Sequence, residues 1–381
     1  MTSFFRRIGF ASAALAQVND GTAAASHPAA ALRGRTDALR SAALALLSIR
    51  FIQGFIYWGG GSRRFIYAPA KLDPNAASWM ANKLQSAMPG ALLGTDQLIA
   101  FLLHHFYLLY TSLILFSAAE LIAGLLLITG LFTRAAALVS IGLSVMLMLM
   151  FGWQGATCID EWTMAACNSA IGATLMLGGS GAFSLDNALL ARRPALARRA
   201  WFRWLSGALP LPMQRESFQR IAVAAFAATV ILNVATYDYF RGSVVTPFHG
   251  GPVSPSKHHL SLTNGVLLPN GAVRFHAYLD GGTPATPSNV MTAVLKSSDG
   301  SVLELWDGTA LSHLPASAIA NEFAYNRFAS GPFGLRAQMG AMATITLPAA
   351  SASDAGSLSR AATLQLRTVN GNTFNVRIRT E

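Results

Sequence analysis

The stretch AAALVSIGLSVMLMLMFGW, from Ala135 to Trp153, carries no charged residue. A helix that crosses a membrane needs about 20 apolar residues, because about 30 Å of hydrocarbon is spanned at about 1.5 Å per residue. Met164 to Leu185 is likewise uncharged, and three more segments meet the condition with one charged residue each. These are Ser41 to Trp58 with Arg50, Phe101 to Leu131 with Glu120, and Ile221 to Phe240 with Asp238. The sequence therefore predicts five membrane helices.

The composition agrees with a membrane protein. Of 381 residues, 52% are hydrophobic and 12% are charged, and this charged share is about half that of an ordinary soluble domain. Such a balance argues against a simple cytosolic enzyme. The net charge of +11 is scattered between apolar blocks, which is typical of loops at a membrane and not of a nucleic-acid-binding face. We expect a lipid bilayer as the environment and no nucleic acid as partner, and self-association into a homo-oligomer stays open.

Basic residues in short loops indicate the side of the membrane that each loop occupies. The segment 186–217, between the fourth and fifth helices, is rich in arginine and is predicted to be a cytoplasmic loop. Its arginines include Arg192, Arg193, Arg198, Arg199, Arg203 and Arg215. Counting helices from this loop predicts a multi-pass protein of the cytoplasmic (inner) membrane, with the N-terminus inside and everything after Phe240 outside. The alanine-rich residues 1–38 are expected to form a disordered cytoplasmic extension.

After Phe240 the composition shifts toward Gly, Pro, Ser and Thr, and short runs alternate between apolar and polar residues. Residues 273–279 alternate in this way, and Asp299-Gly300 and Asn370-Gly371 separate strand-like runs as tight hairpin turns do. Roughly seven such runs predict an all-β, sandwich-like extracytoplasmic domain at 241–381. It follows an α-helical membrane bundle of four helices at 39–185, the basic loop at 186–217 and a fifth membrane helix at 218–240.

Two charged residues lie deep within predicted membrane helices. An unpaired charge there costs at least about 2.5–3.5 kcal/mol on insertion scales, so Arg50 and Glu120 should face the bundle interior and each other. The pair could be a buried ion pair or proton relay beside a ligand, or it could only fix helix packing. Arg63, Arg64 and Lys71 depart from the orientation rule, because they fall on the predicted outer side. They would attract an anionic substrate, or they are solvated charge or contacts of lipid phosphates.

The chain has two cysteines, Cys158 and Cys167. The predicted topology places Cys158 in an outer loop and Cys167 about one turn into the fourth helix, on a side where a disulfide is permitted. The two could form a structural bridge or remain unconnected thiols. They could also form a redox-active pair that accepts two electrons and passes them to a lipid-soluble acceptor.

His104 and His105 lie at the same predicted boundary, as does Trp153. Histidines there can hydrogen-bond a quinone carbonyl or take part in its protonation, and ordinary interfacial polar residues are the alternative. The sequence contains no usual metal-ligand spacing, no Walker or Rossmann glycine motif and no Cys-x-x-Cys-His motif. No metal, nucleotide or covalent haem is therefore predicted.

Two sets of motifs resemble known families. Arg50 followed by Gly54, and Glu120-x3-Gly124-x5-Gly130-x3-Arg134, resemble the DoxX/DoxD group of small helical membrane proteins. The C-terminal part is similar to the DoxA subunit in Leu303-Glu304-Leu305-Trp306-Asp307, in the stretch IANEFAYN at 319–326, and in Leu335 to Pro348. Together the resemblance covers residues 40–381. The DoxD and DoxA subunits form a thiosulfate:quinone oxidoreductase, and fusions in this order are known for the family.

The resemblance implies a membrane-bound thiosulfate dehydrogenase with quinone as electron acceptor. Thiosulfate attracted by Arg63, Arg64 or Lys71 would attack a disulfide between the two cysteines, and a second thiosulfate would release tetrathionate. The dithiol would then reduce quinone near the two histidines and Trp153. The structural-bridge interpretation of the cysteines stays open. So do two other functions, a non-catalytic membrane anchor or assembly partner for an exported sulfur-metabolism protein, and a small-anion transporter.

Overall fold

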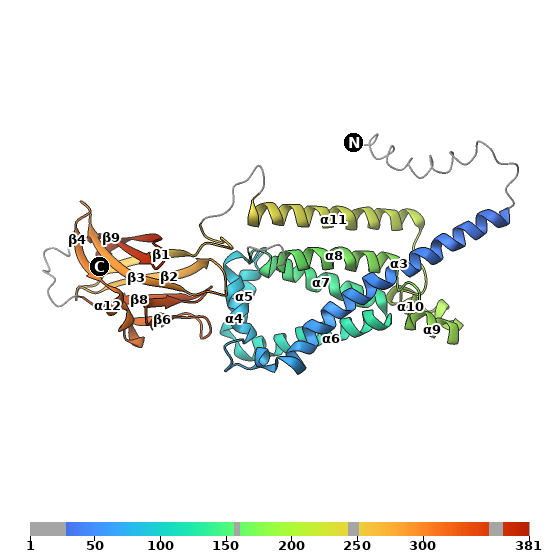
Figure 1. The fold of residues 1–381 in the computed structure, drawn as a ribbon, viewed down its shortest axis with the longest axis horizontal. Coiled ribbons are helices and arrows are strands. Elements are labelled where there is room, and N and C mark those ends of the chain that lie inside the picture. Colours follow the sequence, from blue (N-terminus) through green and yellow to red (C-terminus); the bar gives the residue numbers. More distant parts are fainter. Residues whose placement is uncertain (1–27, 156–160, 243–250, 350–360, 381) are drawn as a thin grey trace, which may run out of the picture.

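The computed structural model describes residues 28–155, 161–242, 251–349 and 361–380, which form a helical bundle joined end to end with a β-domain (Figure 1). Four segments are long and apolar enough to cross a membrane: Asp37–Tyr67, Phe106–Thr129, Thr133–Phe151 and Arg215–Phe240. They correspond to α3 (Pro28–Ser62) with the turn after it, α6 (Phe106–Thr129), α7 (Thr133–Phe151) and α11 (Arg215–Arg241). The shorter α8 (Glu161–Gly178) packs along α7. The predicted order of membrane bundle and β-domain is confirmed.

Several helix boundaries differ from the prediction. Helix α3 already includes residues 28–38, which were expected to belong to the disordered extension; the rest of that extension lies outside the described residues. The predicted helix from Phe101 is divided at His105, whose φ of −121° and ψ of 82° end α5 (Thr95–His104) before α6 begins. Helix α8 ends at Gly178 and not at Leu185, because Gly179 and Gly181 adopt left-handed backbone angles that stop a helix.

Glycines set the closest helix crossing. A Cβ built on Gly54 of α3 would lie 2.7 Å from the backbone nitrogen of Ile128, and one built on Gly124 of α6 would overlap the backbone of Trp58. The two helices therefore touch backbone to backbone at this point. The motif glycines that resemble DoxD thus have a packing role.

The β-domain is one curled sheet with the strand order β5-β8-β2-β1-β10-β9-β3-β7-β6, and β4 pairs with β3. All described pairs are antiparallel except β1 with β10. The strands are β1 (His259–Leu267), β2 (Val273–Gly281), β3 (Ser288–Ser297), β4 (Val302–Trp306), β5 (Ile319–Asn321), β6 (Phe328–Gly331), β7 (Gly334–Ala337), β8 (Met342–Leu347), β9 (Ala361–Thr368) and β10 (Thr373–Thr380). The side-chain amide of Asn321 in β5 bonds in both directions to Phe328 of β6, so the two sheet edges meet and the sheet nearly closes.

Both predicted hairpin turns are present. Asp299-Gly300 joins β3 to β4, and Asn370-Gly371 joins β9 to β10. Gly300 (φ 86°) and Gly371 (φ 80°) take the positive angles that such turns require. The alternation at 273–279 forms β2, whose apolar residues face the buried core.

The β-domain docks on α4 (Met80–Ala87) and α5, which lie across one end of the bundle (Figure 1). The buried Gln85 donates from Nε2 to the carbonyls of Asn326 (2.9 Å) and Gly340 (3.0 Å) and accepts from the backbone N–H of Asn326 (2.8 Å). Asn326 in turn donates from Nδ2 to the carbonyls of Asn82 (2.8 Å) and Met339 (2.7 Å). The hydrogen bonds of Gln85 and Asn326 therefore fix the position of the β-domain relative to α4.

We expect Gln85→Ala to loosen the β-domain from the bundle. The change leaves two buried carbonyls and one buried N–H without partners, and each unsatisfied group costs about 1–3 kcal/mol. Hydrogen exchange of residues 322–327 should rise at least tenfold in the variant. Gln97→Ala, on the exposed face of α5, is the matched control and should exchange like the parent. Equal exchange in Gln85→Ala and the parent would contradict the docking role.

Candidate functional site

A stripe of polar side chains follows one face of α3 into the bundle. The hydroxyl of Tyr57 donates to the carbonyl of Ser140 (2.8 Å) and lies 2.7 Å from Oγ of Ser144. One turn earlier, Gln53 donates from Nε2 to Oγ of Ser140 (3.3 Å) and to the carbonyl of Asn168 (3.0 Å). These buried groups connect α3 with α7 and α8. Their spacing of three to four residues within an apolar helix is a signal that could have identified them from the sequence.

The stripe ends at an ion pair between Arg64 and Glu120. Nη1 of Arg64 donates to Oε2 of Glu120 and, at 3.5 Å, to Oγ of Ser117, and its guanidinium lies 5.5 Å from the ring centre of Phe116. Gly60 makes room for the carboxylate, because a Cβ there would lie 2.9 Å from Oε2. Both side chains of the ion pair are mostly buried, at 15% and 13% exposed. Such a pair can hold a fixed charge, or a proton, at the edge of the membrane interior.

The predicted pairing of Glu120 with Arg50 is therefore wrong. Arg50 lies at the opposite end of the bundle and donates to the carbonyls of Ser180, Ala182 (3.2 Å) and Phe183 (3.0 Å). These carbonyls are free because the left-handed glycines end α8 just before them. Arg50 thus satisfies carbonyls that follow the end of α8, and the partner of Glu120 is Arg64.

Cationic side chains gather around the Arg64–Glu120 pair. Arg63 and Arg64 belong to a π-helical turn (Arg63–Tyr67), and Lys71 lies in the 3₁₀ turn that follows (Pro69–Leu72). Burial lowers the pKa of Lys71, and the positive charges of Arg63, Arg64 and Lys83 lower it further. The structure thus brings the predicted cationic trio together and adds Lys83 of α4, which the sequence did not single out. We call Arg63, Arg64, Lys71 and Lys83 the cationic cluster.

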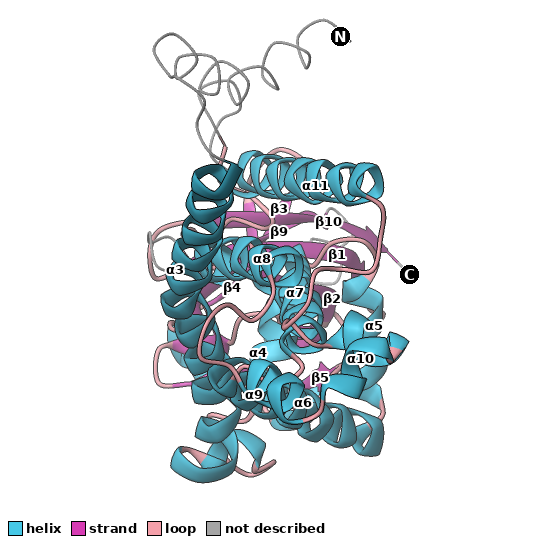
Figure 2. Ribbon diagram, turned by 90° about the vertical axis from the view of Figure 1, so that its right-hand side faces the viewer, coloured by secondary structure: helices cyan, strands magenta, loops and turns pink. Residues whose placement is uncertain are grey.

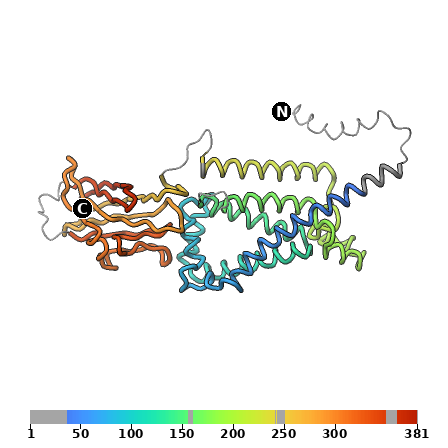
Figure 3. The backbone as a smooth tube through the Cα atoms, in the orientation of Figure 1, coloured from blue at the N-terminus to red at the C-terminus, as the bar shows by residue number. Residues whose placement is uncertain are grey.

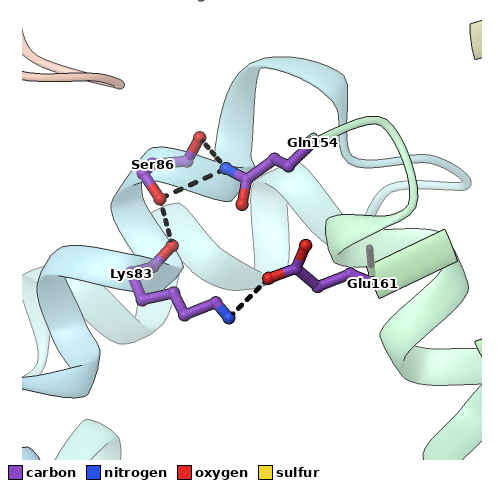
Figure 4. A network of polar contacts seen from close by, with 4 residues as sticks. All are labelled: Lys83, Ser86, Gln154 and Glu161. Carbon is purple, nitrogen blue, oxygen red and sulfur yellow. Dashed lines mark hydrogen bonds and ion pairs between the residues drawn. The ribbon is translucent and has the colours of Figure 1, made fainter. Parts of the chain in front are cut away.

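Two carboxylates neutralise part of this cluster. Nζ of Lys83 lies 2.7 Å from Oε1 of Glu161 at the start of α8 (Figure 4). In the same network Nε2 of Gln154 donates to the carbonyl (2.6 Å) and to Oγ (3.2 Å) of Ser86 (Figure 4). With Glu120 on Arg64 and Glu161 on Lys83, Arg63 and Lys71 are the members of the cluster without an ion pair among the described residues. They are the charges available to an anion.

The structure describes one cysteine of the predicted pair, Cys167. Cys158 lies outside the described residues. Gln154, two residues before that segment, and Glu161, directly after it, are both held against α4 by the contacts just described. Cys167 lies on an exposed face of α8, about 9 Å along the helix from Glu161 at about 1.5 Å per residue. Its side chain is exposed on the surface of the protein.

The predicted quinone residues separate into two places. His104 and His105 are exposed at the junction of α5 and α6; the ring of His104 lies 4.8 Å from that of Phe323 in the β-domain, and Nδ1 of His105 lies 2.7 Å from the carbonyl of Phe101. Trp153 is fully buried and donates from Nε1 to the carbonyl of Ala87 (2.8 Å). Its ring packs on Gly90 and joins the β-domain core. Trp153 therefore packs between the two domains, and its side chain is not exposed to a quinone.

An aromatic cluster beside the histidines was not predicted. Trp79 is buried, its ring is 5.3 Å from Tyr325 and 5.7 Å from Phe106, and its Nε1 has no hydrogen-bond partner among the described residues. Tyr325 and Phe323 come from the stretch that resembles DoxA. Both domains thus contribute to the surroundings of His104. No local sequence pattern predicts that the bundle residues Trp79 and His104 meet Tyr325 and Phe323, because more than 200 positions separate the two groups.

In the described ranges no group of three His, Cys, Asp or Glu side chains is placed to hold a metal ion. The family model described as TQO small subunit DoxD matches residues 45–212, and the one described as TQO small subunit DoxA matches residues 240–377. The matches follow one another along the chain, and the interval between them, residues 213–239, contains most of α11. No solved structure matches the chain.

Proposed function

The chain belongs to the DoxD and DoxA families of thiosulfate:quinone oxidoreductase subunits, fused in that order, and on this premise we propose that it oxidises thiosulfate to tetrathionate and reduces membrane quinone. Two thiosulfate ions join through a new sulfur–sulfur bond and release two electrons. Quinone takes up these electrons with two protons and becomes quinol. The observation that carries the proposal is the cationic cluster, whose member Lys83 contacts Glu161 at the start of α8, because a dianion needs positive charge where it enters.

The site works in two exchange steps. The terminal sulfur of thiosulfate attacks a disulfide between Cys158 and Cys167, which forms a thiosulfonate adduct on one sulfur and frees the other as a thiolate. A second thiosulfate attacks the adduct, leaves as tetrathionate and frees the second thiolate. Oxidation of this pair by quinone, with two protons taken up, restores the disulfide. Arg63 and Lys71 attract the anions, and His104 and His105 hold the quinone.

The Arg64–Glu120 pair has a supporting role in this scheme. Glu120 keeps Arg64 in place and offsets its charge, so the attraction for thiosulfate is concentrated on the unpaired members of the cluster. The β-domain end of the bundle faces the extracytoplasmic side. The arginine-rich segment 186–217 lies at the opposite end (Figure 1), which agrees with a cytoplasmic location for that segment under the positive-inside rule.

The test is thiosulfate-dependent reduction of a soluble quinone analogue by membranes that contain the chain, compared with the same membranes without it. A rate well above the background, with tetrathionate formed in equal amount to quinol, supports the proposal. If the inserted, intact protein gives no rate, the proposal fails and the chain is better described as a membrane anchor for another exported protein. Thiosulfate uptake without quinone reduction would instead favour an anion transporter.

The lowered pKa of Lys71 predicts a pH dependence for thiosulfate binding. Loss of the Lys71 proton removes one positive charge, so KM for thiosulfate should rise as the pH increases through a value below the ordinary 10.5. The rise should be about fivefold, since one cation near a bound anion contributes about 1 kcal/mol. In Lys71→Arg the side chain stays charged, so KM should remain flat over the same range while kcat follows the parent. An unchanged alkaline rise in Lys71→Arg would assign it to another group.

A further inference from the structure

A cleft of about 590 Å³ opens at the end of the bundle opposite the β-domain. Its walls come from α3, from the end of α8, from the segment 207–213 and from the start of α11. Figure 2 views the helices α3, α8 and α11 from this end. Most of the lining is apolar, including Leu177, Leu211, Met213 and Phe218. The volume is within the range of small-molecule sites, and the walls suit hydrocarbon.

Two arginines give this apolar cleft a positive charge. Arg134 is only 4% exposed and donates from Nε to the carbonyl of Met176 (3.1 Å) and from Nη1 to those of Arg203 (3.2 Å) and Ser206 (2.8 Å). Its Nη2 makes no hydrogen bond to a described residue. Arg215, in the first turn of α11, also lines the cleft, and the described lining contains no carboxylate.

The nearest carboxylate cannot neutralise both guanidinium groups of the bundle at this end. Asp186 is fully buried and interacts electrostatically with Arg50 as well as with Arg134. Its oxygens already accept the backbone N–H groups of Phe132 (2.9 Å), Thr133 (3.2 Å) and Gly207 (2.7 Å). Asp186 thus provides one negative charge for the two positive charges of Arg50 and Arg134. Arg215 has the exposed Glu216 beside it in α11, but Glu216 does not line the cleft. A ligand with an anionic group would restore the balance.

Helix α11 is held to the bundle mainly at its other end. Thr236 accepts a hydrogen bond from Nε1 of Trp162 (2.8 Å), and Phe240 is buried beside Gly152. Before Thr236 no residue of α11 is buried, and the tube in Figure 3 shows the helix running beside α8 before the chain enters the β-domain. A ligand in the cleft would touch Arg134 of the bundle and Arg215 of α11 together.

We propose that this cleft binds an anionic phospholipid, whose phosphate lies between Arg134 and Arg215 and whose acyl chains cover the apolar walls. Charge complementarity and the apolar lining together select this class, since basic pockets between membrane helices bind anionic headgroups. Free phosphate would satisfy the arginines but leave the apolar walls uncovered. The bound lipid fixes the start of α11 against the bundle.

The test is native mass spectrometry of the purified full chain in detergent, titrated with phosphatidylglycerol or with phosphatidylcholine of the same acyl chains. The parent should bind phosphatidylglycerol at least fivefold more tightly. Arg215→Gln should weaken that binding about fivefold, as expected for one cation at a phosphate. Arg220→Gln, also exposed on α11 but outside the cleft, is the matched control and should bind like the parent. Leu211→Trp fills the cleft without changing charge and should weaken binding as well.

Three outcomes would overturn the proposal. Equal affinity for the two lipids would show that the arginines do not select a headgroup. Equal weakening in Arg215→Gln and Arg220→Gln would show that the preference for phosphatidylglycerol comes from the overall positive charge at this end of the bundle and not from the cleft. Displacement of phosphatidylglycerol by an equal concentration of inorganic phosphate would make free phosphate the ligand. Thermal unfolding of each variant in detergent verifies that the protein tested is folded.

Discussion

Serine in place of Cys158 or of Cys167 should abolish thiosulfate-dependent quinone reduction, with a loss of about a hundredfold or more. Either change leaves the exchange scheme without a disulfide to open, and a serine hydroxyl cannot carry the electrons. Because Cys167 is exposed on α8, its replacement removes no packing, and membrane insertion should be unaffected. Activity is measured as quinol formed per inserted protein.

The cysteine prediction has a control on the same helix. Ala170→Ser introduces a hydroxyl on the exposed side of α8, three residues after Cys167, and should keep the parental rate. The thiol state of the two cysteines gives a second readout. A pair that becomes reduced with thiosulfate and oxidised again with quinone agrees with the scheme. Near-normal turnover in Cys158→Ser, or a disulfide that never opens, would leave the cysteines with a structural role alone.

Asp186→Ala should destabilise the bundle by about 3–5 kcal/mol, the largest stability effect that we expect from a single change. The substitution removes the acceptor of three backbone N–H groups and leaves Arg50 and Arg134 buried without a nearby negative charge. Breaking a buried charge cluster by removing one partner has this magnitude. Thermal unfolding in detergent, followed by tryptophan fluorescence, measures it.

Glu216→Ala is the control for this stability measurement. Glu216 is an exposed carboxylate in the first turn of α11, and surface changes of this kind usually alter stability by less than about 0.5 kcal/mol. Similar unfolding temperatures for Asp186→Ala and Glu216→Ala would refute the role given to Asp186. A large drop confined to Asp186→Ala would support the role of Asp186 in stabilising the bundle around Arg50 and Arg134.

Several features of the fold follow from local sequence. The membrane helices are predictable because hydrocarbon excludes charge over about 20 residues, and this condition is met or broken within each segment. The turns at Asp299-Gly300 and Asn370-Gly371 are predictable because only a few residues tolerate positive φ angles. The cationic trio could be found because three basic residues fall where the orientation rule does not expect them. The motifs that resemble DoxD and DoxA are also read directly along the chain.

The pairing of charges could not be read in this way. Arg50 and Glu120 looked like partners because each is the charged residue of its predicted helix. The partners of Arg50 are backbone carbonyls 130 to 133 positions away, and backbone groups have no signature in the sequence. The partner of Glu120 comes from the turn after α3, whose position relative to α6 depends on the crossing at Gly54 and Gly124. Helix packing therefore decided which charges meet.

By itself, the sequence determined the order of the apolar segments, the change from helices to strands, the hairpin turns and the family. These depend on residues that are neighbours or near neighbours, whose propensities and hydrophobicity act locally. Only the tertiary structure decided that Trp153 docks the β-domain, that Lys83 joins the cationic cluster and that Gln85 meets Asn326 across 241 positions. Such contacts arise when distant elements pack, because a buried polar group must find whichever partner the packing brings within reach.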